Sequence, residues 1–189
     1  MRYLHSLVSI FLILAASAAA GSFTAEMDVD TYVDAEMADQ SFSDSNMLWT
    51  VSQGGEPSKE IYLSFINILG SQGIFDPEQI ESATLTVDVT QVDKPGKVTA
   101  YFLHGATLST ATWSDKEDYD TESSSSPVEI KDAGSYNFDV TEIIKKAVET
   151  CTEGCPYSIV LVAEDDASMA LSSSKSEGDE PKLTYITAE

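Results

Sequence analysis

Apolar and polar residues alternate along much of the chain. In residues 83–89 every second residue is apolar, and the residues between them are threonine or aspartate. This period of two predicts a strand with one buried face. Shorter patterns that predict further strands occur at residues 30–33, 47–51, 60–66, 98–103, 136–140, 157–162, 169–171 and 182–185. The chain is therefore expected to be an all-β protein.

One segment instead has the spacing of a helix. The apolar residues of segment 141–148 fall on one helical stripe, and Glu142 and Lys146 lie four residues apart on the other side. Asp139 or Thr141 can cap its first turn. A short helix among many strands predicts an antiparallel, jelly-roll-like β-sandwich whose single α-helix covers one end.

Two loops have distinctive sequences. Residues 93–96 read Asp-Lys-Pro-Gly, which predicts a tight turn with Pro95 fixing φ and Gly96 taking a positive φ. This turn would join the strands on either side of it as a hairpin. The run of four serines at 123–126 predicts a flexible surface loop.

The first twenty residues predict a secretory signal peptide. A short polar start with Arg2 and His5 precedes an apolar run, and three alanines come before Gly21. A membrane anchor is the alternative, but the apolar stretch 7–20 is shorter than the roughly 20 residues that span a bilayer. Residues 21–189 are then expected to form one exported domain, extracellular or associated with a cell wall, with no other membrane-spanning segment.

The charge balance narrows the possible partners. The 189 residues contain 10 Lys+Arg and 32 Asp+Glu, which gives a formal net charge of −22. Nucleic acids and anionic membranes are bound through clusters of basic residues, and the chain has none. The 42% of hydrophobic residues is enough for a buried core.

Cysteine and histidine are scarce. Cys151 and Cys155 are the only cysteines, and in an exported protein they are expected to form a short disulfide. A zinc site would need two more soft ligands, and after signal removal only His104 remains. His104 is read as a surface residue, and no Gly-x-Ser-x-Gly motif accompanies it. We therefore expect no catalytic residues, although a carboxylate pair acting on polysaccharide stays an alternative.

Several stretches resemble the DNRLRE-domain family, which comprises exported β-sandwich modules related to carbohydrate-binding modules. The resemblance rests on segments 30–33, 61–65, 80–85, 138–141, 171–177 and 181–185. It implies a β-sandwich that binds extracellular polysaccharide. The family places arginines before the Phe strand and in the segment near the end, where this chain has Ile61 or Lys59 and Lys175.

Three residues are candidates for carbohydrate binding. Trp113 follows a predicted strand with Tyr119 close behind it, and aromatic faces stack on pyranose rings. Lys175 could meet an acidic sugar. The alternatives are that Trp113 plugs one end of the sandwich and that Lys175 is a solvated loop residue. The strong negative charge favours a neutral glycan over a polyuronate.

Aspartates near the start of the domain suggest a second hypothesis. Asp28 and Asp30 lie on one face of a predicted strand, and Asp34 follows them. Carboxylate oxygens are the ligands that Ca²⁺ prefers, so these three residues are candidate calcium ligands. The protein would then be an acidic structural or adhesive matrix protein. The alternative is a solvated acidic surface without bound metal.

Overall fold

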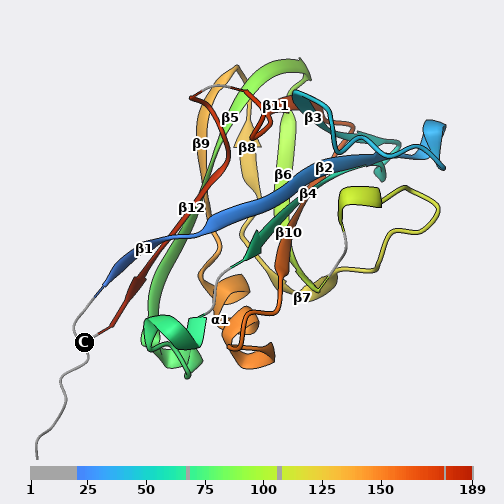
Figure 1. Cartoon of the computed structure of the whole chain (residues 1–189). Coiled ribbons are helices and arrows are strands. Elements are labelled where there is room, and N and C mark those ends of the chain that lie inside the picture. The colour runs from blue at the N-terminus through green and yellow to red at the C-terminus, as the bar shows by residue number, and fades with distance from the viewer. Residues whose placement is uncertain (1–20, 67–68, 106–107, 177, 189) are drawn as a thin grey trace, which may run out of the picture.

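A computed structural model describes residues 21–66, 69–105, 108–176 and 178–188. The strands are β1 (Ser22–Thr24), β2 (Glu26–Asp34), β3 (Met47–Gln53), β4 (Glu56–Ile66), β5 (Ile80–Lys94), β6 (Gly96–His104), β7 (Asp120–Ser124), β8 (Val128–Ile130), β9 (Gly134–Asp139), β10 (Tyr157–Ala163), β11 (Ser168–Ser172) and β12 (Lys182–Thr187). Among the described residues the one α-helix is α1 (Thr141–Thr150), shown in orange in Figure 1. The predicted signal peptide lies outside the described residues.

The strands form an antiparallel, 12-stranded sheet that curls around the core. Its main order is β1-β12-β5-β11-β3-β4-β10-β6-β7, while β2 pairs with β4, β8 with β6 and β9 with β5. The all-β prediction is confirmed. Hydrogen bonds connect the strands into one rolled sheet, so the two halves of the expected sandwich are joined through β11, β3 and β4.

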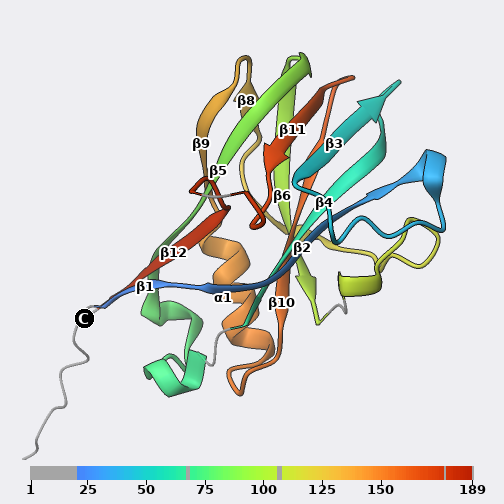
Figure 2. The same cartoon turned by 45° about the horizontal axis from the view of Figure 1, so that its top comes forward.

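The main core lies inside this roll. Alternate residues of β4, β5, β6 and β10 point into it, and α1 closes one end of the strands (Figure 2). The helix buries Ile143, Ile144, Ala147 and Val148, which is the predicted apolar stripe. Asp139 Oδ1 accepts hydrogen bonds from the Thr141 N–H at 3.1 Å and the Thr141 hydroxyl at 2.6 Å, so it ties down the first turn.

The predicted disulfide is confirmed immediately after the helix. Cys151 and Cys155 are bonded, with their Cα atoms 5.9 Å apart. The closed loop is short, so the bond constrains the unfolded chain little and is expected to contribute about 1–2 kcal/mol. Its local effect is to fix the chain between α1 and β10.

The predicted hairpin is wrong. β5 pairs with β9, β11 and β12, whereas β6 pairs with β7, β8 and β10. The chain therefore turns at Pro95 and enters the opposite side of the roll. Gly96 does not have a positive φ. A Cβ there would lie 2.5 Å from the Ala167 Cβ, so glycine is needed because the neighbouring loop approaches closely.

The first strands join both halves of the roll. β1 pairs with β12, and after Ala25 the chain continues as β2 and pairs with β4. Figure 1 shows this segment in blue running across the front of the sheet. At its start the Gly21 N–H donates to Thr187 Oγ1 at 2.9 Å, and the Thr187 N–H donates to the Gly21 carbonyl at 2.9 Å. The beginning and end of the described chain are thus paired.

Candidate carbohydrate site

The outer face of the β2–β4–β10–β6 part of the sheet carries a second buried cluster. It consists of Val33, Tyr62, Leu103, Leu108, Val160 and Val162. Leu108 belongs to the 3-10 helix η4 (Leu108–Thr110), which follows β6. Ala111, Trp113 and Tyr119 pack against the cluster and are partly buried. Residues 108–119 therefore cover this outer face, and we call the covered residues the outer cluster.

A lysine connects the covering segment to the sheet. The Lys116 Nζ lies 3.8 Å from the centroid of the Trp113 ring, which is a cation–π contact. The same Nζ donates to Glu60 Oε1 at 2.6 Å. The Glu60 side chain is only 2% exposed, so Lys116 pairs with a buried carboxylate.

Two tyrosines surround the same carboxylate. The Tyr62 hydroxyl donates to Glu60 Oε2 at 2.8 Å. Burial, and next the charge of Glu60, raise the pKa of Tyr62 above its ordinary value. The same causes raise the pKa of Tyr119 to about 12. Both hydroxyls therefore stay protonated at neutral pH, and Tyr119 also packs on Tyr101 with the ring centroids 4.7 Å apart.

A pocket of ≈ 210 Å³ opens beside Lys116. Its apolar floor includes Leu103 and Leu108, and its polar rim includes Thr110, Asp115, Lys116 and Glu117. Trp113 does not line the pocket itself but contacts it through Lys116. An apolar floor with a few polar groups at the rim suits a ligand that has both C–H faces and hydroxyls.

The structure thus brings two of the three predicted sugar-binding residues together. Trp113 and Tyr119 pack against the same outer cluster, and both are half-buried. Trp113 is partly buried against the outer cluster, and Lys116 lies over its ring. The predicted role of Trp113 and Tyr119 in binding sugar stays a prediction.

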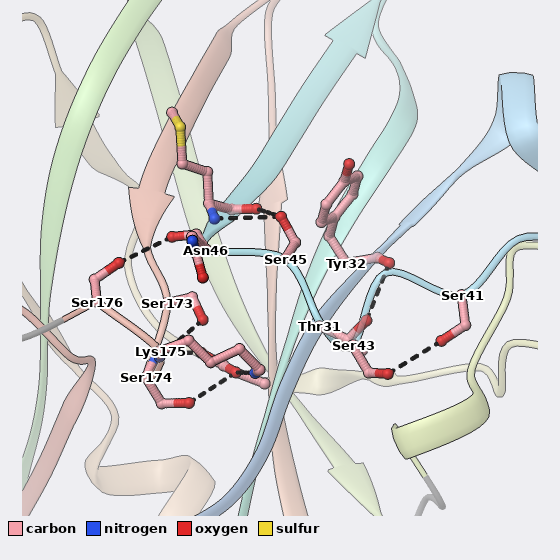
Figure 3. A network of polar contacts seen from close by, with 12 residues as sticks. Thr31, Tyr32, Ser41, Ser43, Ser45, Asn46, Ser173, Ser174, Lys175 and Ser176 are labelled. Atoms are coloured by element: carbon pink, nitrogen blue, oxygen red, sulfur yellow. Dashed lines mark hydrogen bonds and ion pairs between the residues drawn. The ribbon is translucent and has the colours of Figure 1, made fainter.

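Lys175 lies at a different position, in the turn after β11. Its Nζ donates to Asp30 Oδ1 at 2.7 Å, and the Ser174 hydroxyl donates to the same oxygen at 2.9 Å. Figure 3 shows Ser174 and Lys175 in this turn, with Ser176 reaching the Asn46 carbonyl. The Asp30 side chain is fully buried, so Lys175 neutralises an internal charge. Its role toward an acidic sugar stays a prediction.

The three candidate calcium ligands have different surroundings. Asp28 is exposed, whereas Asp30 and Asp34 are buried and ion-paired, Asp34 with Lys59 at 2.7 Å. In the part of the chain that the structure describes, no group of three or more His, Cys, Asp or Glu side chains is arranged to hold a metal ion. The calcium site therefore stays a prediction. Lys59 and Lys175, which stand where the resemblance expects arginines, both neutralise buried aspartates.

Sequence reasoning did not identify Glu60, Tyr62 and Lys116. Glu60 and Tyr62 alternate with the core residues of β4, which normally indicates a solvent-facing side. Lys116 stands inside an acidic run. A lysine among carboxylates, three residues after a tryptophan, is the local signal that could have suggested an internal ion pair.

Comparison with known proteins supports a carbohydrate-binding assignment. No curated protein sequence matches the chain. None of the helices in the described ranges is long and apolar enough to cross a membrane. The resemblance to carbohydrate-binding modules is confirmed at the level of the class, while export and the narrower DNRLRE name stay predictions. Residues 22–187 match carbohydrate-binding module family 96, and the chain belongs to that family.

Proposed function

We propose that this protein is an exported, non-catalytic module that holds extracellular polysaccharide at the pocket beside Trp113 and Lys116. The observation that carries the proposal is the pocket itself, with an apolar floor on the outer cluster and a hydroxyl, carboxylates and an ammonium at its rim. The family assignment supplies the class of ligand. The disulfide fits an oxidising compartment.

The size of the pocket limits what it can hold. Its ≈ 210 Å³ is below the about 300–1,000 Å³ of typical small-molecule sites. One sugar ring of a longer chain is the largest unit that we expect it to enclose. The Asp115 and Glu117 carboxylates can accept hydrogen bonds from sugar hydroxyls, and Lys116 and Thr110 can donate to them.

Charge favours a neutral glycan at this pocket. Its rim carries Asp115 and Glu117 against Lys116, and Lys116 already neutralises Glu60. A polyuronate would add carboxylates to a surface that is already negative, in a protein of formal net charge −22. Neutral polysaccharides should therefore bind more tightly at low salt, and the difference should shrink as salt screens the repulsion.

The proposal predicts that Trp113→Ala weakens binding about tenfold, because it removes the cation–π contact that holds Lys116 at the rim. Such a contact contributes about 0.5–2 kcal/mol, and 1.4 kcal/mol is one factor of ten. Glu117→Gln removes a charge at the rim and should give a smaller loss. Binding is measured by affinity electrophoresis in gels that contain β-glucan, mannan, galactan, alginate or pectate. Phe75→Ala, which removes a 68% exposed aromatic elsewhere, is the matched control.

Two results would count against this function. If none of the polysaccharides retards the wild-type protein, the proposed ligand class is wrong. If Trp113→Ala and Glu117→Gln both leave the retardation unchanged, the pocket is not the binding site. Release of sugar products during incubation with any of these polymers would contradict the non-catalytic role and favour the polysaccharide-acting enzyme.

A further inference from the structure

Two serines lie beside the outer cluster, on the same face of the sheet. Ser64 of β4 and Ser158 of β10 are opposite each other in the antiparallel pairing, and Ser158 is also opposite Leu103 of β6. Ser64 shares its face with Tyr62, two residues earlier in β4. Because Leu103 and Tyr62 line the pocket beside Lys116, the two serines continue the floor of that pocket along the sheet.

Both serines are buried without a polar partner. Ser64 is 1% exposed, and Ser158 is fully buried. Neither hydroxyl has a hydrogen-bond partner within the ranges that the structure describes. A buried hydroxyl that makes no hydrogen bond carries a desolvation cost, which a suitable partner removes. Two such groups opposite each other mark a place where a hydroxyl-bearing ligand would be favourable.

The 3-10 helix η4 crosses this face of the sheet. Its first residue, Leu108, is 3% exposed and packs in the outer cluster with Leu103 of β6. The helix also packs on β2, at the opposite border of this face (Figure 2). The strands between β6 and β2 are β10 and β4. The helix therefore lies over the two strands that carry the buried serines.

The attachment of η4 is weaker than that of the residues that follow it. Those residues are held by Lys116, whose Nζ donates to Glu60 Oε1 at 2.6 Å. Among the described residues, η4 accepts one hydrogen bond from a distant segment, from the Ser41 hydroxyl to the Ser109 carbonyl at 3.4 Å. A bond of this length is weak. The helix is therefore kept on the sheet mainly by the apolar packing of Leu108.

The size of the pocket also points to a movable helix. At ≈ 210 Å³ the pocket is smaller than the about 300–1,000 Å³ of typical small-molecule sites. Leu108 lines it, and η4 lies over the strands of the two serines. Displacement of the Leu108 side chain would join the pocket to the space above Ser64 and Ser158, and so enlarge the site.

We propose that Leu108 is a displaceable plug, and that Ser64 and Ser158 form a deeper floor of the same site. The proposal rests on the function assigned to the pocket. In the closed form, Leu108 covers the two hydroxyls and leaves them unpaired. In the open form, a sugar ring seated on Leu103 takes the place of the Leu108 side chain, and its hydroxyls pair with both serines. The ion pair at the rim stays in place.

The plug predicts that stability and affinity change in opposite directions. A weaker plug raises the population of the open form, and the apparent affinity rises with that population. Leu108→Ala should therefore lower the melting temperature but strengthen binding several-fold. The combined variant Ser64→Ala, Ser158→Ala removes two unpaired hydroxyls and should raise the melting temperature by about 2–4 °C. Its binding should weaken about tenfold, because two hydrogen bonds to the ligand are lost.

Two matched controls separate the plug from ordinary effects on stability. Leu69→Ala truncates a fully buried leucine at the start of another 3-10 helix, η2 (Leu69–Gln72), which packs in the main core. Ser52→Ala removes a hydroxyl on β3 that is also buried and, in the described part of the chain, without a hydrogen-bond partner. Each control should shift the melting temperature in the same direction as the variant it matches and leave binding unchanged.

Scanning calorimetry measures the melting temperatures, and affinity electrophoresis in gels with β-glucan, mannan or galactan measures binding. Retardation of Leu108→Ala that does not exceed that of the wild type would overturn the plug. A lower melting temperature in the double serine variant would also overturn it, since the hydroxyls would then have partners in the folded protein. Leu108→Val serves if circular dichroism finds Leu108→Ala unfolded.

The same gels separate failure of the plug from failure of the function assigned to the pocket. If the wild type is retarded and the Leu108 and serine variants migrate like their controls, the pocket stands and only the plug is wrong. If neither the wild type nor any variant is retarded, the assigned function is wrong and the plug is wrong with it. Retardation of Leu108→Ala alone would support the plug, because the closed form would then block the site.

Discussion

Both faces of strand β4 are buried, but by different kinds of contact. Toward the core, Ile61, Leu63 and Phe65 pack against other apolar side chains and are fully buried. Toward the outside, Glu60 and Tyr62 are also buried, but beneath residues 108–119 and with Lys116 as a charged partner. The inner face is closed by the sheet itself, whereas the outer face is closed by a segment that needs specific polar contacts.

This difference shows which face of β4 offers polar groups to a ligand. Apolar packing on the inner face leaves no polar group to meet a ligand. On the outer face, the ion pair that holds the covering segment also places an ammonium, two carboxylates and an apolar floor around one pocket. The same contacts therefore stabilise the segment and position the rim.

The largest expected effect comes from the inner face. Leu63→Ala should lower the free energy of unfolding by about 3 kcal/mol, because it removes buried methyl groups and leaves a cavity. Urea unfolding followed by circular dichroism measures this loss. Ile66→Ala, at a 46% exposed position of the same strand, should change stability by no more than about 0.5 kcal/mol. Similar losses for the two variants would contradict the assigned inner face.

On the outer face, the stability should depend on the ion pair between Lys116 and Glu60. Lys116→Met leaves the Glu60 charge buried without its partner and should cost about 2 kcal/mol. Adding Glu60→Gln to this variant should recover part of the loss, since the unpaired charge is gone. Lys131→Met removes a lysine that is 65% exposed and should have little effect. If the loss of unfolding free energy in the double variant equalled the sum of the losses in the two single variants, Glu60 and Lys116 would not be energetically coupled.

A smaller effect is expected at alkaline pH. The folded protein raises the pKa of Tyr119 to about 12, mainly by burial, and burial also raises the pKa of Tyr62 and Tyr157. An unfolded tyrosine ionises near pH 10, so the unfolded state then binds fewer protons than the folded state. Stability should be unaffected below pH 10 and fall as the pH rises above it.

Denaturant titrations between pH 8 and 12 measure this dependence. Tyr119→Phe removes one ionisable group from the outer cluster and should make the fall less steep between pH 10 and 12. Tyr136→Phe, at a half-buried tyrosine of β9 outside the outer cluster, is the comparison. Equal slopes for both variants would contradict the raised pKa of Tyr119 in the folded state.

Local features of the fold could be predicted from the sequence. The period of two at 83–89 lies within β5, the stripe at 141–148 lies within α1, and Cys151 bonds to Cys155. These predictions depend on neighbouring residues. The pairing of β5 and β6 could not be predicted, since alternation indicates that a strand has a buried face but not which strand lies beside it.

The candidate site was predictable only in part, for the same reason. Trp113 and Tyr119 stand close together in the chain, and their aromatic character was enough to single them out. Lys116 reaches Glu60 across 56 residues of sequence. Because both faces of β4 are buried, the polar half of its alternation resembled a solvent-exposed side. Only the position of the covering segment resolves this.

The pairing of β1 with β12 has a consequence for how the protein matures. Hydrogen bonds here join residues 166 positions apart, so the first strand finds its partner only when the last one has left the ribosome. Closure of the roll is then a late step in folding, since distant segments must meet before it can occur. A polypeptide whose first and last strands pair with each other therefore lacks its closing contact until synthesis of both strands is complete.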